Sequence, residues 1–303
     1  MKKRRQHYVW QHYLKPWATD NKIFCLRDNK VFESSLIGIA NERDFYRLKE
    51  LNKEDIAFIE KLVIEQSPKL LQKLHTNLIK QFNFVFDLKS FIQSQGIDNP
   101  VVSEKIEETV NNLEEDFHSR IEDSVIGHIE SIRSGNTDFF NNDKGFIDFI
   151  YFLCVQYMRT KKVKTSVIAN VRPPENIDIE KIWNILSHIF ATNMGGSLYT
   201  DRKNFRLLLL DNRSSAPFIT GDQPVVNTYA TGDLKNPPQQ LELYYPVSPV
   251  TAVLLTESKK YEADKQRSVG LVEATAYNEH IVRNRHDQIF AASRKALEAY
   301  VHL

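Results

Sequence analysis

Hydrophobic and polar positions divide the chain into regions of different periodicity. Residues 23–35 alternate apolar and polar side chains on either side of Asp28-Asn29-Lys30, a pattern that predicts a β-hairpin with a turn at those residues. From Asn52 onward, apolar residues recur at helical spacing. We expect Gly195-Gly196 to end this helical region, because the runs that follow are short and typical of strands.

The helical region divides into several predicted segments. Asn52 is placed to cap the first helix, and Pro68 either starts a second helix or kinks the first. Longer helices are predicted over residues 103–132, 144–168 and 179–193.

The strand region completes the predicted architecture. Its strands are predicted at residues 205–210, 216–220, 241–248 and 251–256, followed by a strand-like QIFAAS and a helical tail from about Arg294. Such segregated blocks are typical of an α+β fold, here an antiparallel sheet built from the N-terminal hairpin and the C-terminal strands, with a large inserted helical block. We expect one domain over residues 1–303, divided into 1–50 (N-terminal segment and hairpin), 51–200 (helices) and 201–303 (sheet and C-terminal helix).

Composition narrows the class of protein. Among 303 residues, 42% are hydrophobic and 26% charged, which is typical of a globular chain. The charges of the 40 Lys and Arg residues and the 39 Asp and Glu residues nearly cancel, so any affinity for nucleic acid must come from local basic patches. Two distant cysteines without a Cys-x-x-Cys pair indicate neither a disulfide scaffold nor a structural zinc site.

The N-terminal sequence predicts the cellular location. The basic start MKKRRQHYVW lacks an apolar signal core, and no window is long and apolar enough to span a membrane. We therefore expect a cytoplasmic protein without a membrane partner.

Well-marked catalytic motifs are missing from the sequence. It contains no Gly-rich phosphate loop after a strand, no Gly-x-Ser-x-Gly and no His-Glu-x-x-His. Candidate chemistry is therefore sought in clusters of polar residues.

The opening segment QHYVWQHYL is the first cluster. In a helix, His7 and Gln11 would share one face, as would Tyr8 and His12. The simpler interpretation is that these rings pack the segment onto the body of the protein. The alternative is that His7 serves as an acid or base, because histidine titrates near neutral pH.

Residues 41–50, NERDFYRLKE, form the second cluster. In a strand, Glu42 and Asp44 would face the same side and could bind a divalent cation. Arg43 and Tyr46 belong to a stretch in which arginines and aromatic residues interleave, as on surfaces that hold phosphates and stack bases. The competing interpretation, which we favour, is an irregular loop with solvated charges.

The third cluster lies in the most apolar helix. Gln156 interrupts its apolar face and Arg159 follows on the adjacent ridge. A buried amide needs hydrogen-bond partners, and Gln156 either bonds to a neighbouring loop or orients a functional histidine or carboxylate.

Asp222 marks the fourth cluster. A strand that ends in Thr220-Gly221-Asp222, followed by Pro224, places a carboxylate at a strand end, a common position for functional groups. An Asx-turn explains Asp222 equally well.

Together these segments resemble the family named domain of unknown function 4238 (DUF4238). The resemblance spans nearly the whole chain and implies a shared fold, whereas it supplies no activity to transfer. Two positions depart from the family pattern, Trp10 in place of a proline and Gly221 in place of a serine. The matching segments are His7–Leu14, Glu42–Tyr46, Gln156–Thr160, Phe218–Val225, Tyr244–Pro249 and Asn278.

If these polar groups converge, they would form a pocket suited to phosphodiester chemistry, in which carboxylates hold a metal or act as bases and arginine stabilises negative charge. The leading hypothesis is a nuclease-like or nucleotide-directed hydrolase, an effector of a bacterial conflict system. The alternative is a non-catalytic binding or sensor module with a protein partner or a second copy of the chain.

The residues are assigned to three roles. The expected catalytic residues are His7, Glu42, Arg159 and Asp222, and those expected to bind a nucleotide or nucleic acid are Gln11, Arg43, Tyr46 and Gln156. Mg²⁺ or Mn²⁺ would bind Glu42 and Asp222. The histidines without an assigned partner, expected to be ordinary core or surface residues, are His75, His118, His128, His188, His280 and His286.

Overall fold

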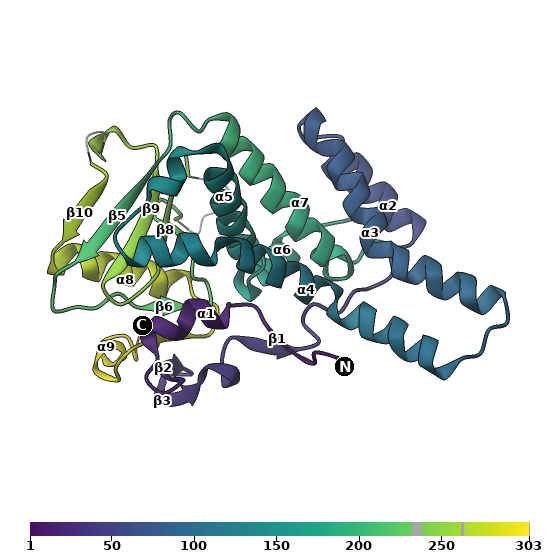
Figure 1. The fold of residues 1–303 in the computed structure, drawn as a ribbon, viewed down its shortest axis with the longest axis horizontal. Coiled ribbons are helices and arrows are strands. Elements are labelled where there is room, and N and C mark those ends of the chain that lie inside the picture. The colour runs from purple at the N-terminus through teal and green to yellow at the C-terminus, as the bar shows by residue number, and fades with distance from the viewer. Residues whose placement is uncertain (232–237, 262–263, 303) are drawn as a thin grey trace.

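The computed structural model describes residues 1–231, 238–261 and 264–302. The strands of its two larger sheets gather at one end of the molecule, and the long helices α3 (Lys69–Ser94) and α4 (Pro100–Arg133) extend as an antiparallel pair toward the other (Figure 1). The fold is α+β with mostly antiparallel strand pairing and a large helical block inserted between the N-terminal hairpin and the C-terminal strands.

The N-terminal hairpin forms as the sequence predicts. Strands β2 (Lys22–Arg27) and β3 (Lys30–Ser35) are joined by Asp28 and Asn29, whose positive φ values of 51° and 58° suit a two-residue hairpin turn. Strand β2 also pairs with β11 (Ile289–Ala291), which confirms that the hairpin joins C-terminal strands. This sheet has the order β3-β2-β11-β6, with β6 at Thr220–Gly221.

The remaining C-terminal strands build a second, five-stranded sheet rather than extending the first. Its order is β10-β5-β9-β8-β7, with β10 parallel to β5 and the other pairs antiparallel. Alternate leucines of β5 point into two different core clusters, Leu207 into one and Leu208 into the other, which explains why this strand reads as a continuous apolar run. The strand bounds are β5 Arg206–Asn212, β7 Val226–Asn227, β8 Glu242–Pro246, β9 Thr251–Thr256 and β10 Gln266–Val269.

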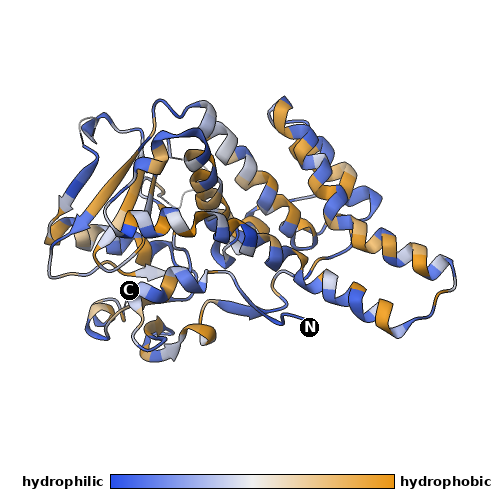
Figure 2. Ribbon diagram, in the orientation of Figure 1, coloured by the Kyte–Doolittle hydropathy of each residue, from blue (hydrophilic) through white to orange (hydrophobic). Residues whose placement is uncertain are grey.

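Helix α8 (Leu271–Asn284), which the sequence pattern did not reveal, packs Ile281 and Ala274 into the same cluster as Leu208. Figure 2 shows hydrophobic residues concentrated in the central strands of the five-stranded sheet and in α5 and α7, whereas β1 and β10 are hydrophilic. Among the helices of the described residues, none combines the length and apolar character needed to cross a membrane.

Two predictions about the helical block are wrong in detail. Residues 144–168 form two helices rather than one, because Arg159 ends the first and Thr160 caps the second by accepting a hydrogen bond from the Val163 N–H. Gly195-Gly196 does not end a helix. A Cβ at Gly196 would lie 2.8 Å from Leu71 Cδ1, so glycine there permits close packing against α3. The other helices of the block are α2 Lys53–Ile59, α5 Asp143–Met158, α6 Lys161–Asn170 and α7 Ile179–Thr200.

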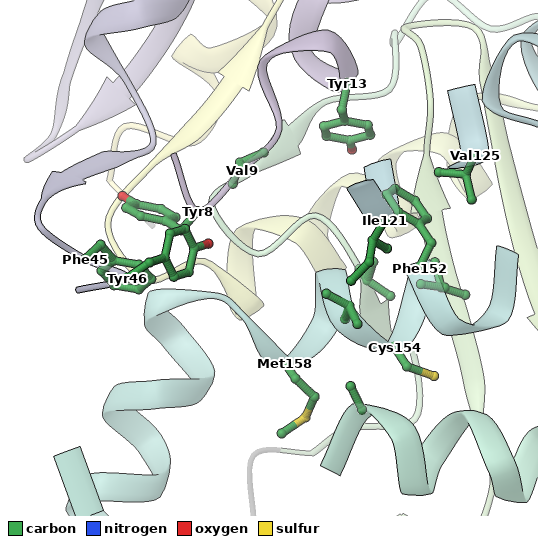
Figure 3. Close-up of a cluster of buried hydrophobic side chains, with 14 of the residues drawn as sticks. Tyr8, Val9, Tyr13, Phe45, Tyr46, Ile121, Val125, Phe152, Cys154 and Met158 are labelled. Atoms are coloured by element: carbon green, nitrogen blue, oxygen red, sulfur yellow. The ribbon is translucent and has the colours of Figure 1, made fainter. Parts of the chain in front are cut away.

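The N-terminal segment lies between the helices and both sheets. It contains β1 (Arg5–His7), which pairs with β4 (Asn41–Arg43), and the short helix α1 (Gln11–Leu14). Its Tyr8, Val9 and Tyr13 are buried: Tyr8 lies beside Phe45 and Tyr46 (Figure 3), and the Tyr13 ring stacks on that of Tyr245 in β8. The Tyr13 hydroxyl forms a 2.6 Å hydrogen bond with that of Thr220. A last short helix, α9 (Lys295–Glu298), follows β11.

Candidate functional site

A small cavity of about 190 Å³ lies between the N-terminal segment, α4 and the end of α5. It brings together three of the residues expected to form a site, His7, Gln11 and Arg159. The other lining residues are Trp10, Glu115, His118, Ser119 and Glu122.

His7 and Gln11 meet across the turn between β1 and α1. The Gln11 Nε2 lies 3.0 Å from Nε2 and 3.2 Å from Nδ1 of His7, so the amide can donate to whichever ring nitrogen is unprotonated. Their four-residue spacing was expected from a shared helical face, whereas the structure brings them together through a strand-to-helix turn. Burial lowers the pKa of His7 from its ordinary 6.5, and the positive charges of Arg159 and Arg5 lower it further.

Arg159 closes the inner wall of the cavity and is 4% exposed. Its guanidinium donates to the Tyr46 hydroxyl at 2.9 Å, to Glu122 Oε1 at 2.6 Å and to the His7 carbonyl oxygen at 2.6 Å. Burial raises the pKa of Glu122, and Arg159 opposes that effect. Tyr46, expected to contact substrate, thus lies behind the cavity as a partner of Arg159.

Glu115 is the lining residue with the most distinctive chemistry, and it is not among the site residues expected from the sequence. Burial raises its pKa to about 7, although the charges of Arg159 and Lys3 oppose the shift. Its Oε2 has no hydrogen-bond partner within the described part of the chain. The sequence does carry a signal, because Glu115, Ser119 and Glu122 fall at helical spacing and form a polar stripe on one face of α4.

Glu42 and Arg43 do not line this cavity. Glu42, 46% exposed, forms an ion pair with Lys161 at 3.2 Å. Glu42 and Arg43 both line a separate surface depression of about 550 Å³ on the β1–β4 ribbon, together with Arg4, Arg5 and Asn41. The expected pairing of Glu42 with Asp44 on one strand face is not formed, because β4 ends at Arg43 and Asp44 takes a positive φ of 57°.

Asp222 is fully buried and bonded to backbone. Its carboxylate accepts hydrogen bonds of 2.8, 2.7 and 2.8 Å from the N–H groups of His286, Asp287 and Gln288, just before β11. Burial raises the pKa of Asp222, and these three bonds oppose the effect. The structure therefore does not give Glu42 and Asp222 the shared, exposed cation site expected from the sequence, because one carboxylate is at the surface and the other is saturated in the core.

Gln156 lies elsewhere on α5. It is 1% exposed, does not line the cavity, and its Nε2 has no hydrogen-bond partner among the residues that the structure describes.

The fold and cavity define an α+β protein whose N-terminal segment and helical block together enclose a small pocket lined by charged and polar side chains. A family model described as "Protein of unknown function (DUF4238)" matches residues 5–295, so the chain belongs to this family. No curated protein and no solved structure matches it.

The two departures from the family pattern fit the structure. Trp10 has φ −60°, the value that a proline ring imposes, so the turn before α1 keeps a geometry that a proline would adopt. Gly221 lies in β6, where a Cβ would come within 3.1 Å of the Gln288 carbonyl oxygen, and it does not line the cavity.

Proposed function

We propose that the chain is a hydrolase that acts on nucleotides or nucleic acids at the cavity between the N-terminal segment and α4. The observation that carries the proposal is that His7 and Glu115 line the same cavity with displaced pKa values. Burial keeps His7 neutral at pH 7, and a pKa of about 7 leaves Glu115 partly protonated. A neutral imidazole and a protonated carboxyl are the species required for a general base and a general acid at neutral pH.

The depression on the β1–β4 ribbon supports a phosphate-containing substrate. Arg5 lies directly opposite Arg43 in the strand ladder, and like charges in this position destabilise a ribbon unless an anion lies between them. Arg5 has no ion-pair partner among the described residues, and Arg43, 76% exposed, has only a long ion pair with Asp44, at 3.7 Å. Because Arg5 and His7 belong to one strand, a phosphate held by the ribbon would lie beside the cavity.

One observation favours the alternative, a non-catalytic binding or sensor module. Arg159 and Asp222, two of the four expected catalytic residues, use their charged groups in buried contacts that hold chain segments together. In that case the β1–β4 ribbon would bind a nucleotide, and the cavity would change conformation on binding without catalysing a reaction.

The test is hydrolysis of labelled RNA, DNA and nucleotides by the purified chain, with and without Mg²⁺ or Mn²⁺. Glu115→Gln and His7→Gln should each lower kcat about 100-fold or more, the range typical of a lost acid or base. Asp116→Asn is the matched control, because Asp116 is the next carboxylate on α4 and is exposed and paired with Lys3. Undiminished hydrolysis by both variants would refute the assignment, and nucleotide binding without hydrolysis by the wild type would favour the module.

A further inference from the structure

A second group of polar side chains is buried behind the wall of the cavity. Glu114 and His118 lie one turn apart on α4, and His188 approaches them from α7. The side chains of all three are at most 3% exposed. Both histidines were expected to be ordinary core or surface residues without partners, whereas the fold brings them together.

The distances within this group do not fit hydrogen bonding. Glu114 Oε1 lies 3.6 Å from Nε2 of His118 and 3.6 Å from Nε2 of His188, beyond a normal hydrogen bond. Two ligand atoms each about 2.1 Å from a tetrahedral metal ion are about 3.4 Å apart. One ligand atom from each residue can be chosen so that all lie within 4.8 Å of one another. The two separations from Glu114 are therefore close to those of ligands around one ion, and small side-chain movements would bring the third ligand atom into range.

The unsatisfied polar atoms provide an independent observation. Both ring nitrogens of His118, both of His188 and Glu114 Oε2 lack hydrogen-bond partners within the residues described by the structure. A buried polar group left without a partner costs about 1–3 kcal/mol, so five such atoms in one place favour a ligand that offsets part of this cost.

Aromatic packing holds the rings in place. The centroid of the His118 ring lies 4.7 Å from that of Tyr46, and the His188 ring lies 5.0 Å from that of Phe117. The two imidazoles are 5.0 Å apart, centroid to centroid. Substituting either histidine therefore need not disturb any hydrogen bond.

We propose that Glu114, His118 and His188 bind one divalent first-row transition metal ion, either Zn²⁺ or Fe²⁺. Two imidazoles and one carboxylate are the ligand set that these ions share in proteins, whereas Mg²⁺ is bound mainly through oxygen. Three protein ligands leave a coordination position open, and His118 also lines the cavity, so the ion would border the space occupied by His7 and Glu115.

The experiment is metal titration of the full chain after treatment with a chelator. Zn²⁺ or Co²⁺, and Fe²⁺ under anaerobic conditions, should bind with a stoichiometry of one and raise the melting temperature in a concentration-dependent way. Bound Co²⁺ should show the visible absorption of a low-coordinate nitrogen and oxygen site. His118→Gln and His188→Gln should each weaken binding by about 100-fold or more, beyond the 10–100-fold typical of residues that only support a ligand.

His75→Gln is the matched control. His75 is also fully buried in the helical block, but its Nε2 is hydrogen-bonded to Asn193 at 2.8 Å and it lies outside the group. This variant should retain the wild-type affinity. If a histidine variant fails to fold, Glu114→Gln, which changes charge with little change in volume, replaces it in the titration.

Absence of saturable binding by the folded wild type, or unchanged affinity in the His118 and His188 variants, would overturn the proposal. Stabilisation by Mg²⁺ alone would also overturn it. Metal binding is measured without substrate, so a chain that binds the ion and hydrolyses nothing would refute the proposed hydrolase and leave the metal site standing.

Discussion

At the scale of single residues, Arg159 joins parts of the chain that are far apart in sequence. Its three hydrogen bonds reach β1, α4 and the segment after β4, so one guanidinium fixes the inner wall of the cavity. The sequence identified Arg159, His7 and Gln11 because a charged or amide group in an apolar context is conspicuous. It missed Glu115 because acidic residues on a long helix usually face solvent, and only the packing of β1 against α4 buries this one.

Arg159→Ala should lower the free energy of unfolding by about 3–5 kcal/mol, because it leaves Glu122 buried without its counter-ion. Urea denaturation provides the measurement. Arg43→Ala, at an exposed site, is the control and should cost less than about 1 kcal/mol. A loss below 1 kcal/mol for Arg159→Ala would mean that the buried pair contributes little.

The lowered pKa of His7 predicts a specific pH dependence. The unfolded chain takes up the imidazole proton near pH 6.5, whereas the folded chain does so only at lower pH. Stability associated with neutral His7 is therefore complete above pH 6.5 and is lost as the pH falls toward the folded pKa.

The free energy of unfolding of the wild type should accordingly fall more between pH 7.5 and 5 than that of His7→Gln, as measured by urea denaturation at several pH values. His302→Gln, at an exposed position, should follow the wild type. Parallel curves for the wild type and His7→Gln would show that His7 has an unperturbed pKa.

At the scale of secondary-structure elements, the sequence located most helices and strands but not their ends. The break between α5 and α6 was not predicted, because helical apolar spacing continues across it. The break forms at Thr160, which caps α6 and also hydrogen-bonds Gln223. The sequence predicted a helix end at Gly195-Gly196 because a glycine pair usually weakens a helix. The helix continues there because Gly196, without a Cβ, allows close contact with Leu71. Asp222 also acts between elements, because its carboxylate holds the turn before β11 against the end of β6.

Asp222→Ala should lower the free energy of unfolding by about 3 kcal/mol or more, since it leaves three backbone N–H groups without their acceptor. Hydrogen exchange should accelerate most at residues 286–291. Asp287→Ala is the control, because that side chain is 44% exposed and its ion pair with Lys161 is long, at 3.8 Å. Equal effects of the two substitutions would contradict the structural role of Asp222.

At the scale of the whole molecule, the α+β architecture was predictable from the separated blocks of periodicity. The division of the strands into two larger sheets and the β1–β4 ribbon was not, because strand patterns do not specify partners. The larger core cluster contains residues from Tyr8 to Phe290, so the N-terminal segment, the helical block and the late strands share one interior.

We therefore expect the chain to unfold as one cooperative unit. Calorimetry should show a single transition whose calorimetric and van't Hoff enthalpies agree. Two resolved transitions would instead indicate that the helical block forms a domain of its own.

The pairing of β2 with β11 has a consequence for biosynthesis. On the ribosome, β2 has β3 on one side, but its other edge has no partner until the strand beginning at Ile289 has been made. At roughly 5–20 residues per second, that edge is exposed for on the order of ten to fifty seconds. An unpaired strand edge invites association with other nascent chains. Holdase chaperones that cover the first forty residues should therefore raise the yield of native protein, and moving β11 ahead of β2 by circular permutation should make such help unnecessary.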